Sequence, residues 1–380
     1  MRRRKEIPTK RSLIVGFLVV VLIRQVLDIS IIESNQKIWY NKVDNKFLKQ
    51  QMESYTWGYI QKYPKYTKRL LGIDYEQLEQ LIALGKLLNQ KNKEEIEKTK
   101  IRINQPGSGN NPKLSSEEQI VLMLVYLRHN ISFQLLGLIF QVSESTAHNI
   151  FTYWQKLFEG ELPPSLLEQV KKFQEEEIVL EILTDYELIV DSAEQPIERP
   201  SDYQEQKQYY SGKQKRHTRK SQFIILPKAE DIIDVVIGKP GPMSDMKICR
   251  QTLNKFNTNQ TFSGDKAYIG ETQIKTPHKK PRKGKLTENQ IEENKALSSN
   301  RIFVEHLIRV VKVFKVVQER FRLHKNRYKS VLLTVCGLVR LRISSLILEI
   351  IESSKSGEVI DVRMSHSFMP KLDFVPKNPD

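Results

Sequence analysis

Three carboxylates of this 380-residue sequence stand where a fold can hold acidic oxygens in fixed positions. Asp191 ends a short apolar run, Asp265 follows a second apolar segment directly after Gly264, and Glu305 lies in an amphipathic stretch. Mg²⁺ takes oxygen ligands and keeps several waters, so a few carboxylates from different elements are enough to bind it. Two such ions about 3.5–4 Å apart can activate an attacking oxygen and stabilise a leaving oxygen in phosphodiester cleavage. We therefore predict that Asp191, Asp265 and Glu305 are the catalytic metal ligands, with Mg²⁺ or alternatively Mn²⁺ bound.

The order of the surrounding elements supports this interpretation. The sequence pattern predicts a strand ending at Asp191, further strands at 223–226, 232–237 and 261–263, and helices at 245–256, 287–297, 302–319 and 330–351. Strand, strand, strand, helix, strand, helix is the order of a ribonuclease-H-like α/β fold, in which the first, fourth and final elements bring acids together. Taken singly, an Asp after a strand is more often a turn or cap residue, and a helical Glu usually faces solvent.

A further acid, Asp245, lies at the predicted start of a helix. It stands with Ser244 at the predicted start of the helix at 245–256, where either side chain can accept from the free backbone N–H groups. We expect Asp245 to be a cap rather than a functional acid, and its role stays open.

Residues 114–158 predict three helices. Ser115 or Ser116 can cap the first, the second spans Ser132–Phe140, and Ser143 caps the third after a short turn. Two short helices around a tight turn form the helix-turn-helix pattern. The recognition helix would present Ser145, His148 and Asn149, together with Glu144, to a DNA major groove. An ordinary three-helix bundle is the alternative.

The charge balance favours a polyanionic partner. The chain has 61 Lys+Arg against 45 Asp+Glu, a formal charge of +16 and a pI near 9.5, which is typical of nucleic-acid binding. Two basic stretches, 207–220 and 275–285, contain no acid and are either solvated loops or phosphate-binding walls. The predicted phosphate contacts are Lys213, Lys215, Arg216, Lys279, Lys280 and Arg282. Cys249 and Cys336 are the only cysteines, which excludes a disulfide framework and fits a reducing cytosol.

The N-terminal residues differ from the rest. A basic start precedes the apolar run Leu13–Ile23, which is shorter than the about 20 residues that a membrane span needs. We expect residues 1–51 to be an upstream extension or flexible N-terminus, and the first domain to begin near Met52. N-terminal sequencing of the native protein tests this.

The remaining predicted organisation follows from composition. We predict a first region at 52–113, which is helical over 66–103 and ends in a Pro- and Gly-containing linker at 105–113. We predict a helix-turn-helix domain at 114–165, a catalytic domain at 180–352 and a tail at 353–380. The very apolar helix at 330–351 contains Arg340 and Arg342, so we expect a packed core helix rather than a membrane span.

Residues 187–350 resemble the DDE transposase domain of bacterial insertion sequences of the IS-five group and their Harbinger-like relatives. The matching motifs, in order, are Ile189-Val190-Asp191-Ser192, Tyr210-Ser211-Gly212-Lys213, Gly238-Lys239-Pro240-Gly241 with Ser244-Asp245, Gly264-Asp265-Lys266-Ala267-Tyr268, and Arg301-Ile302-Phe303-Val304-Glu305. The helical signature of the family is Tyr, two residues, Arg, three residues, Glu, six residues, Lys. Arg301, Glu305 and Lys312 match it, whereas Ser298 replaces the Tyr. Residues 114–158 resemble the helix-turn-helix of the same family.

The resemblance implies a transposase that cleaves transposon ends and joins the freed 3′ hydroxyl to target DNA. The helix-turn-helix would read the terminal inverted repeat. Arg301 and Lys312, which share a helix face with Glu305, would contact phosphate or pair with Glu305. The implied partners are double-stranded DNA and further copies of the chain on DNA, with no small-molecule substrate and no membrane, in the bacterial cytoplasm at the nucleoid. A transposase-derived regulator without catalysis and a nuclease without strand transfer are the alternatives, and strand-transfer products separate them.

Overall fold

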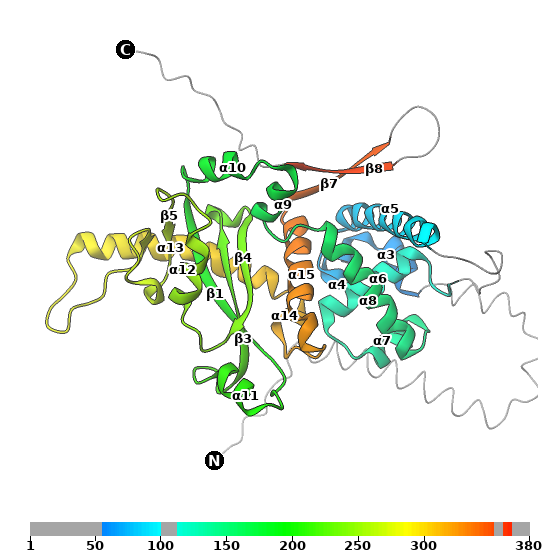
Figure 1. Ribbon diagram of the computed structural model, residues 1–380, viewed down its shortest axis with the longest axis horizontal. Helices are drawn as coiled ribbons and strands as arrows, with labels where there is room; N and C mark the ends of the chain where they lie inside the picture. Colours follow the sequence, from blue (N-terminus) through cyan, green and yellow to red (C-terminus); the bar gives the residue numbers. More distant parts are fainter. Residues whose placement is uncertain (1–54, 100–111, 353–359, 367–380) are drawn as a thin grey trace, which may run out of the picture. The chain divides into compact units, whose positions relative to one another are not determined.

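The computed structural model describes residues 55–99, 112–352 and 360–366 (Figure 1). The predictions for an N-terminal extension over 1–51, for a domain start near Met52 and for most of the linker at 105–113 lie outside the described residues, as does most of the tail.

A mixed sheet forms the centre of the second half of the chain. It is built from β1 (Glu187–Pro196), β3 (Arg216–Ile225), β4 (Ile232–Pro240), β5 (Thr261–Ser263) and β6 (Ile274–Lys275), and the two-residue β2 (Tyr210–Ser211) pairs with the start of β3. The strand order is β4–β3–β1–β5–β6. Strand β3 is antiparallel to both of its long neighbours, β4 and β1, whereas β5 runs parallel to β1 and β6 parallel to β5. This order and these directions define a ribonuclease-H-like sheet, so the predicted α/β fold is confirmed.

Helices cover both faces of the sheet, because side chains alternate between the faces along each strand. Leu188 and Val190 of β1 pack with α9 (Leu166–Phe173), α10 (Glu176–Leu183) and α12 (Asp245–Leu253). Ile189 belongs to the cluster on the opposite face, with α13 (Glu288–Val311) and α15 (Tyr328–Arg342). Figure 1 shows α12 and the long α13 beside the strands.

The helix-turn-helix prediction is confirmed by α6 (Ser116–His129), α7 (Phe133–Phe140) and α8 (Glu144–Glu161). Ser115 caps α6 in a capping box with Glu118, and Ser143 caps α8 through the Thr146 N–H. The turn between α7 and α8 packs closely against Gly137 of α7, where an added Cβ would lie 2.7 Å from the Val142 carbonyl oxygen. Ser115, rather than Ser116, is therefore the cap of the first helix.

The helical region predicted over 66–103 contains α4 (Thr67–Leu71), which ends at Gly72 with a left-handed φ of 92°, and α5 (Tyr75–Thr99); residues 100–103 lie outside the described residues. Upstream of α4 lie α3 (Tyr55–Lys62) and the short 3₁₀ helix η1 (Pro64–Tyr66). The helices predicted at 287–297 and 302–319 are instead the continuous α13, followed by the short α14 (Lys315–Gln318).

The predicted helix at 330–351 is also wrong in its second half. Helix α15 ends at Arg342, Ser344 adopts a left-handed φ of 63°, and β7 (Leu346–Glu352) pairs antiparallel with β8 (Ile360–His366). Within the described residues no helix is long and apolar enough to cross a membrane. Cys249 and Cys336 are free and buried.

The basic stretch 207–220 is not a continuous loop. It comprises the end of α11 (Tyr203–Tyr209), β2 and the first half of β3. The shorter elements that complete the fold are the 3₁₀ helices η2 (Pro227–Ala229), η3 (Lys266–Tyr268) and η4 (Lys325–Arg327).

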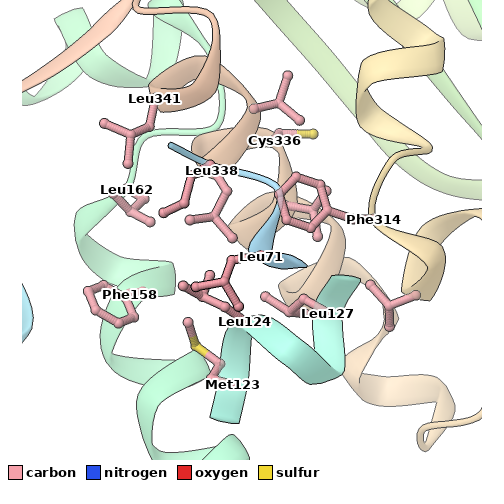
Figure 2. Packing of buried hydrophobic residues seen from close by; sticks show 14 of the residues in the cluster. Leu71, Met123, Leu124, Leu127, Phe158, Leu162, Phe314, Cys336, Leu338 and Leu341 are labelled. Carbon is pink, nitrogen blue, oxygen red and sulfur yellow. The ribbon is translucent and has the colours of Figure 1, made fainter. Parts of the chain in front are cut away.

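One hydrophobic core joins the helix-turn-helix helices to the helices beside the sheet. Figure 2 shows Leu71 of α4 and Leu124 of α6 packed with Phe314 and with Leu338 of α15. All four side chains are fully buried. The helical region and the sheet are therefore held by a shared apolar interior.

Candidate active site and nucleic-acid interface

The register of β1 and β5 brings Asp191 and Asp265 to the same level. Ile189 lies opposite Ser263 in this parallel pair, and each Asp comes two residues further along its own segment. Contrary to the prediction, Asp191 is not at a strand end, because β1 continues to Pro196. Beside Asp191, however, β5 has already ended, which leaves that side of β1 open to the turn carrying Asp265.

Gly264 allows this turn to lie close to β1. An added Cβ at this position would meet the Tyr268 ring at 2.8 Å and the Val190 side chain at 3.2 Å, so a larger residue would displace the turn. Asp265 then caps η3 by accepting a hydrogen bond from the Ala267 N–H at 2.8 Å. The glycine of this Gly-Asp sequence is therefore required by the packing of the turn against the strand.

The Asp191 carboxyl lies in an environment that disfavours its charge. Burial raises its pKa to about 6, and the nearby Asp265 and Asp245 carboxylates act in the same direction. A hydrogen bond from the Ser192 N–H, at 2.8 Å, and the charge of Arg301 oppose the rise. Two carboxylates held together at a partly buried position are the donor set that a divalent cation binds.

Glu305, the acid on helix α13, is connected to the two aspartates only indirectly. Glu305 is 53% exposed and forms an i,i+4 ion pair with Arg301, at 3.7 Å. Arg301 in turn lines a shallow hollow with Asp265, Lys266, Pro277, Asn294 and Ser298. Among the described residues, no group of three or more His, Cys, Asp or Glu side chains is arranged to hold a metal ion. The structure thus brings the two aspartates and Arg301 together and connects Glu305 through Arg301.

Ser298, which departs from the family signature, faces the hollow beside Asp265. Its hydroxyl donates to the Asn294 carbonyl of its own helix, at 2.8 Å. Lys312, the last residue of the signature, is the C-cap of α13 and is partly buried.

A hydrogen-bonded group on the other face of β1 was missed by the sequence analysis. The Tyr268 hydroxyl, in a side chain only 1% exposed, lies 3.1 Å from the Ser192 hydroxyl and accepts from the Gln222 amide at 3.1 Å. Burial raises the pKa of Tyr268 above its usual range. This group joins the turn that carries Asp265 to the strand that carries Asp191. Its only sequence signal was Tyr268 in the Gly-Asp-Lys-Ala-Tyr motif.

Asp245 has a structural partner. Its carboxylate lies 3.0 Å from the Nζ of Lys220, whose side chain is 9% exposed, and Ser244 rather than Asp245 caps α12. Lys220 also donates to the Met243 carbonyl at 2.7 Å. The contact explains why a lysine of the basic stretch points inward, and it favours a structural role for Asp245.

The predicted DNA contacts lie on exposed surface. Ser145, His148 and Asn149 are exposed on the first turns of α8. The predicted phosphate contacts are also exposed, around the start of β3 and after β6: Lys213, Lys215, Arg216, Lys279, Lys280 and Arg282.

Comparison with known proteins agrees with this architecture. Residues 190–340 match the family model described as DDE superfamily endonuclease, and residues 112–164 match that of the helix-turn-helix of DDE superfamily endonuclease. A probable transposase for insertion sequence element IS702 of Microchaete diplosiphon is 32% identical over 231 residues, covering 58% of this chain and 78% of the relative. A solved Mos1 transposase paired-end complex with the left transposon end is similar over 67% of this chain and 84% of that one, at 10% identity and a TM-score of 0.18. The last likeness is too slight to carry any argument.

A ribonuclease-H-like sheet with paired aspartates, preceded by a helix-turn-helix, defines a protein of the DDE endonuclease superfamily. With the matching family models and the insertion-sequence relative, the chain belongs to the DDE-type insertion-sequence transposases.

Proposed function

We propose that this transposase binds transposon-end DNA and catalyses metal-dependent phosphodiester cleavage and strand transfer, with Asp191, Asp265 and Glu305 as its metal ligands. The observation that carries the proposal is the parallel register of β1 and β5, which sets Asp191 and Asp265 at one level. The raised pKa of Asp191, caused first by burial, fits a carboxyl whose charge a bound cation would stabilise.

The residues around the aspartates have separable proposed roles. Asp191 and Asp265 would hold Mg²⁺ or Mn²⁺, and Glu305, which pairs with Arg301 in the structure, would complete the ligand set. The ions would supply activation of the attacking oxygen and stabilisation of the leaving oxygen. Arg301, half-buried beside Asp265, then faces the scissile phosphate and neutralises part of its charge. Lys312 extends the same helix face.

Recognition and positioning of DNA would fall to different surfaces. The exposed start of α8, with Ser145, His148 and Asn149, reads base edges of the terminal inverted repeat. The exposed cations before β3 and after β6 contact phosphates and carry no sequence information. The partner is double-stranded DNA, on which further copies of the chain assemble. The place of action is the bacterial cytoplasm at the nucleoid.

The test is cleavage of DNA carrying the element's own ends, in Mg²⁺ and in Mn²⁺. Asp191→Asn, Asp265→Asn and Glu305→Gln are each expected to lower cleavage by at least about 100-fold and to leave DNA binding intact. Glu198→Gln, at a carboxylate that is 69% exposed, is the matched control and should cleave normally. Full cleavage by the three variants would contradict the proposed metal site. Cleaved ends without joined products would favour a nuclease over a strand transferase.

A further inference from the structure

An exposed cluster of aromatic rings lies on α3 and η1, outside both regions that match the family models. Tyr59, Tyr63 and Tyr66 are 39%, 37% and 37% exposed. The ring centroids of Tyr59 and Tyr63 are 4.9 Å apart, and the Tyr66 ring lies 6.3 and 6.2 Å from them. Tyrosine is enriched at contact surfaces because its ring is apolar and its hydroxyl polar, so three partly exposed rings grouped at the surface indicate a contact site.

The cluster is strongly basic. The ammonium of Lys62 lies 5.5 Å from the Tyr63 ring centroid, and that of Lys65 lies 5.2 Å from the Tyr66 centroid. Lys68 and Arg69 are exposed in the next turn, and no Asp or Glu occurs from Thr56 to Ile73. A lysine run alone is commonly a solvated face. Here the cations are combined with exposed rings, which is the composition of a nucleic-acid contact surface.

The segment that carries these residues is firmly anchored. Ile60 of α3 and Leu71, at the end of α4, are both buried in the same hydrophobic core, where Figure 2 shows Leu71. The Leu70 carbonyl oxygen lies 2.8 Å from Nε2 of His129 at the end of α6, and Arg342 donates to the Gly72 carbonyl oxygen. The surface is therefore preformed on the helix-turn-helix domain and needs no ordering to bind.

We propose that Tyr59, Lys62, Tyr63, Lys65 and Tyr66 form a second DNA-contact surface, which grips the phosphate backbone of duplex DNA beyond the part read by α8. The inference rests on the proposed DNA binding of the transposase and adds a site to it. Ammonium groups already lie over two of the ring faces. The surface therefore offers cations to phosphates rather than open rings to unpaired bases.

The test compares full-length variants by fluorescence anisotropy at several salt concentrations, with a duplex carrying the element's end and an unrelated duplex of equal length. Lys62→Gln/Lys65→Gln is expected to weaken binding to both duplexes about 3–10-fold and to make the log–log salt slope shallower by about 1–2. Tyr63→Ser/Tyr66→Ser should weaken both by a similar factor with a smaller change in slope. The matched control is Lys91→Gln/Lys93→Gln, which removes two exposed charges from α5 and should change affinity less than twofold.

The outcomes separate this inference from the proposed function. Equal affinity and slope for Lys62→Gln/Lys65→Gln and its α5 control would overturn the second surface. The wild type would still bind its end sequence in that case, and Asn149→Ala would still weaken that binding. The same titration is repeated with one strand of the end duplex alone, and an effect of Lys62→Gln/Lys65→Gln confined to that single strand would also overturn the proposal. If the wild-type chain bound no DNA, the proposed function itself would fail.

Discussion

Replacing Asp191 by Asn should make the metal-free protein more stable while it abolishes cleavage. Burial raises the pKa of Asp191 from 3.8 to about 6. A carboxyl shifted this far costs about 3 kcal/mol in its ionised form. Asn keeps an acceptor oxygen for the Ser192 N–H but its hydrogen bond is weaker. We therefore expect a net gain of about 1–3 kcal/mol in the free energy of unfolding at pH 7.5.

The pH dependence has a defined sign. Below pH 3.8 the carboxyl is neutral in both the folded and the unfolded chain, so Asp191 carries no penalty there. As pH rises from 3.8 to about 6, the unfolded chain loses its proton first, and the wild type loses stability relative to Asp191→Asn. The difference is then constant above about pH 6.

Thermal unfolding in EDTA measures this difference. The variant should melt about 2–8 °C above the wild type at pH 7.5, and the gap should narrow toward pH 4.5. Glu198→Gln, at a 69% exposed carboxylate, should melt like the wild type at both pH values. A variant that melts at or below the wild type at pH 7.5 would refute the account of a buried carboxyl whose charge is disfavoured in the metal-free protein.

Three further substitutions probe other parts of the structure. Tyr268→Phe removes the hydroxyl between Ser192 and Gln222. The variant should lose about 1 kcal/mol of stability and cleave about tenfold more slowly, with unchanged DNA binding. An unchanged cleavage rate would argue against a positioning role for Tyr268. In the wild type the Asp231 carboxylate lies 2.7 Å from the guanidinium of the fully buried Arg340, and Asp231→Ala removes this charge partner. Urea unfolding should show a loss of about 3–5 kcal/mol in the free energy of unfolding. A loss under about 1 kcal/mol would contradict a buried ion pair. In anisotropy titrations, Asn149→Ala should weaken binding to the element's end by about 1–3 kcal/mol and leave binding to unrelated DNA unchanged. Equal losses on both duplexes would contradict a role of Asn149 in base recognition.

The order of the elements could be predicted from the sequence because short local residue patterns mark where many of them begin. Ser115, Ser132 and Ser143 are helix caps whose side chains accept from the first helical turn, and each begins a helix of the helix-turn-helix. The predicted succession of strands and helices along the chain followed from the apolar runs and their spacing. Local patterning therefore predicted the fold class.

The ends of β1 and α15 depended on partners far away in the chain. Beyond Asp191 the strand loses its apolar character, yet it continues because its backbone pairs antiparallel with β3 as far as Pro196, opposite Thr218. Residues after Arg342 are as apolar as those before it, and only pairing with β8 selects a strand there. Neither partner was visible in a local window.

In the candidate site, too, local sequence patterns identified some residues, whereas contacts between distant segments could not be foreseen. Asp191 and Asp265 were identified from their places after apolar runs, and the parallel register explains why they meet. The hydrogen bond between Tyr268 and Gln222 could not be predicted, because it depends on which face of the sheet each side chain occupies. The role of Glu305 stays a prediction.

The central claim is that Asp191 and Asp265 bind the catalytic cation, and a change of metal specificity tests it most directly. In Asp265→Cys a thiolate, which is a softer ligand, replaces a carboxylate that suits Mg²⁺. End cleavage by this variant should be lost in Mg²⁺ and recover at least tenfold in Mn²⁺, whereas Asp265→Asn should stay inactive in both. Wild-type rates for Asp265→Asn, or cleavage by the wild type in excess EDTA, would contradict the claim.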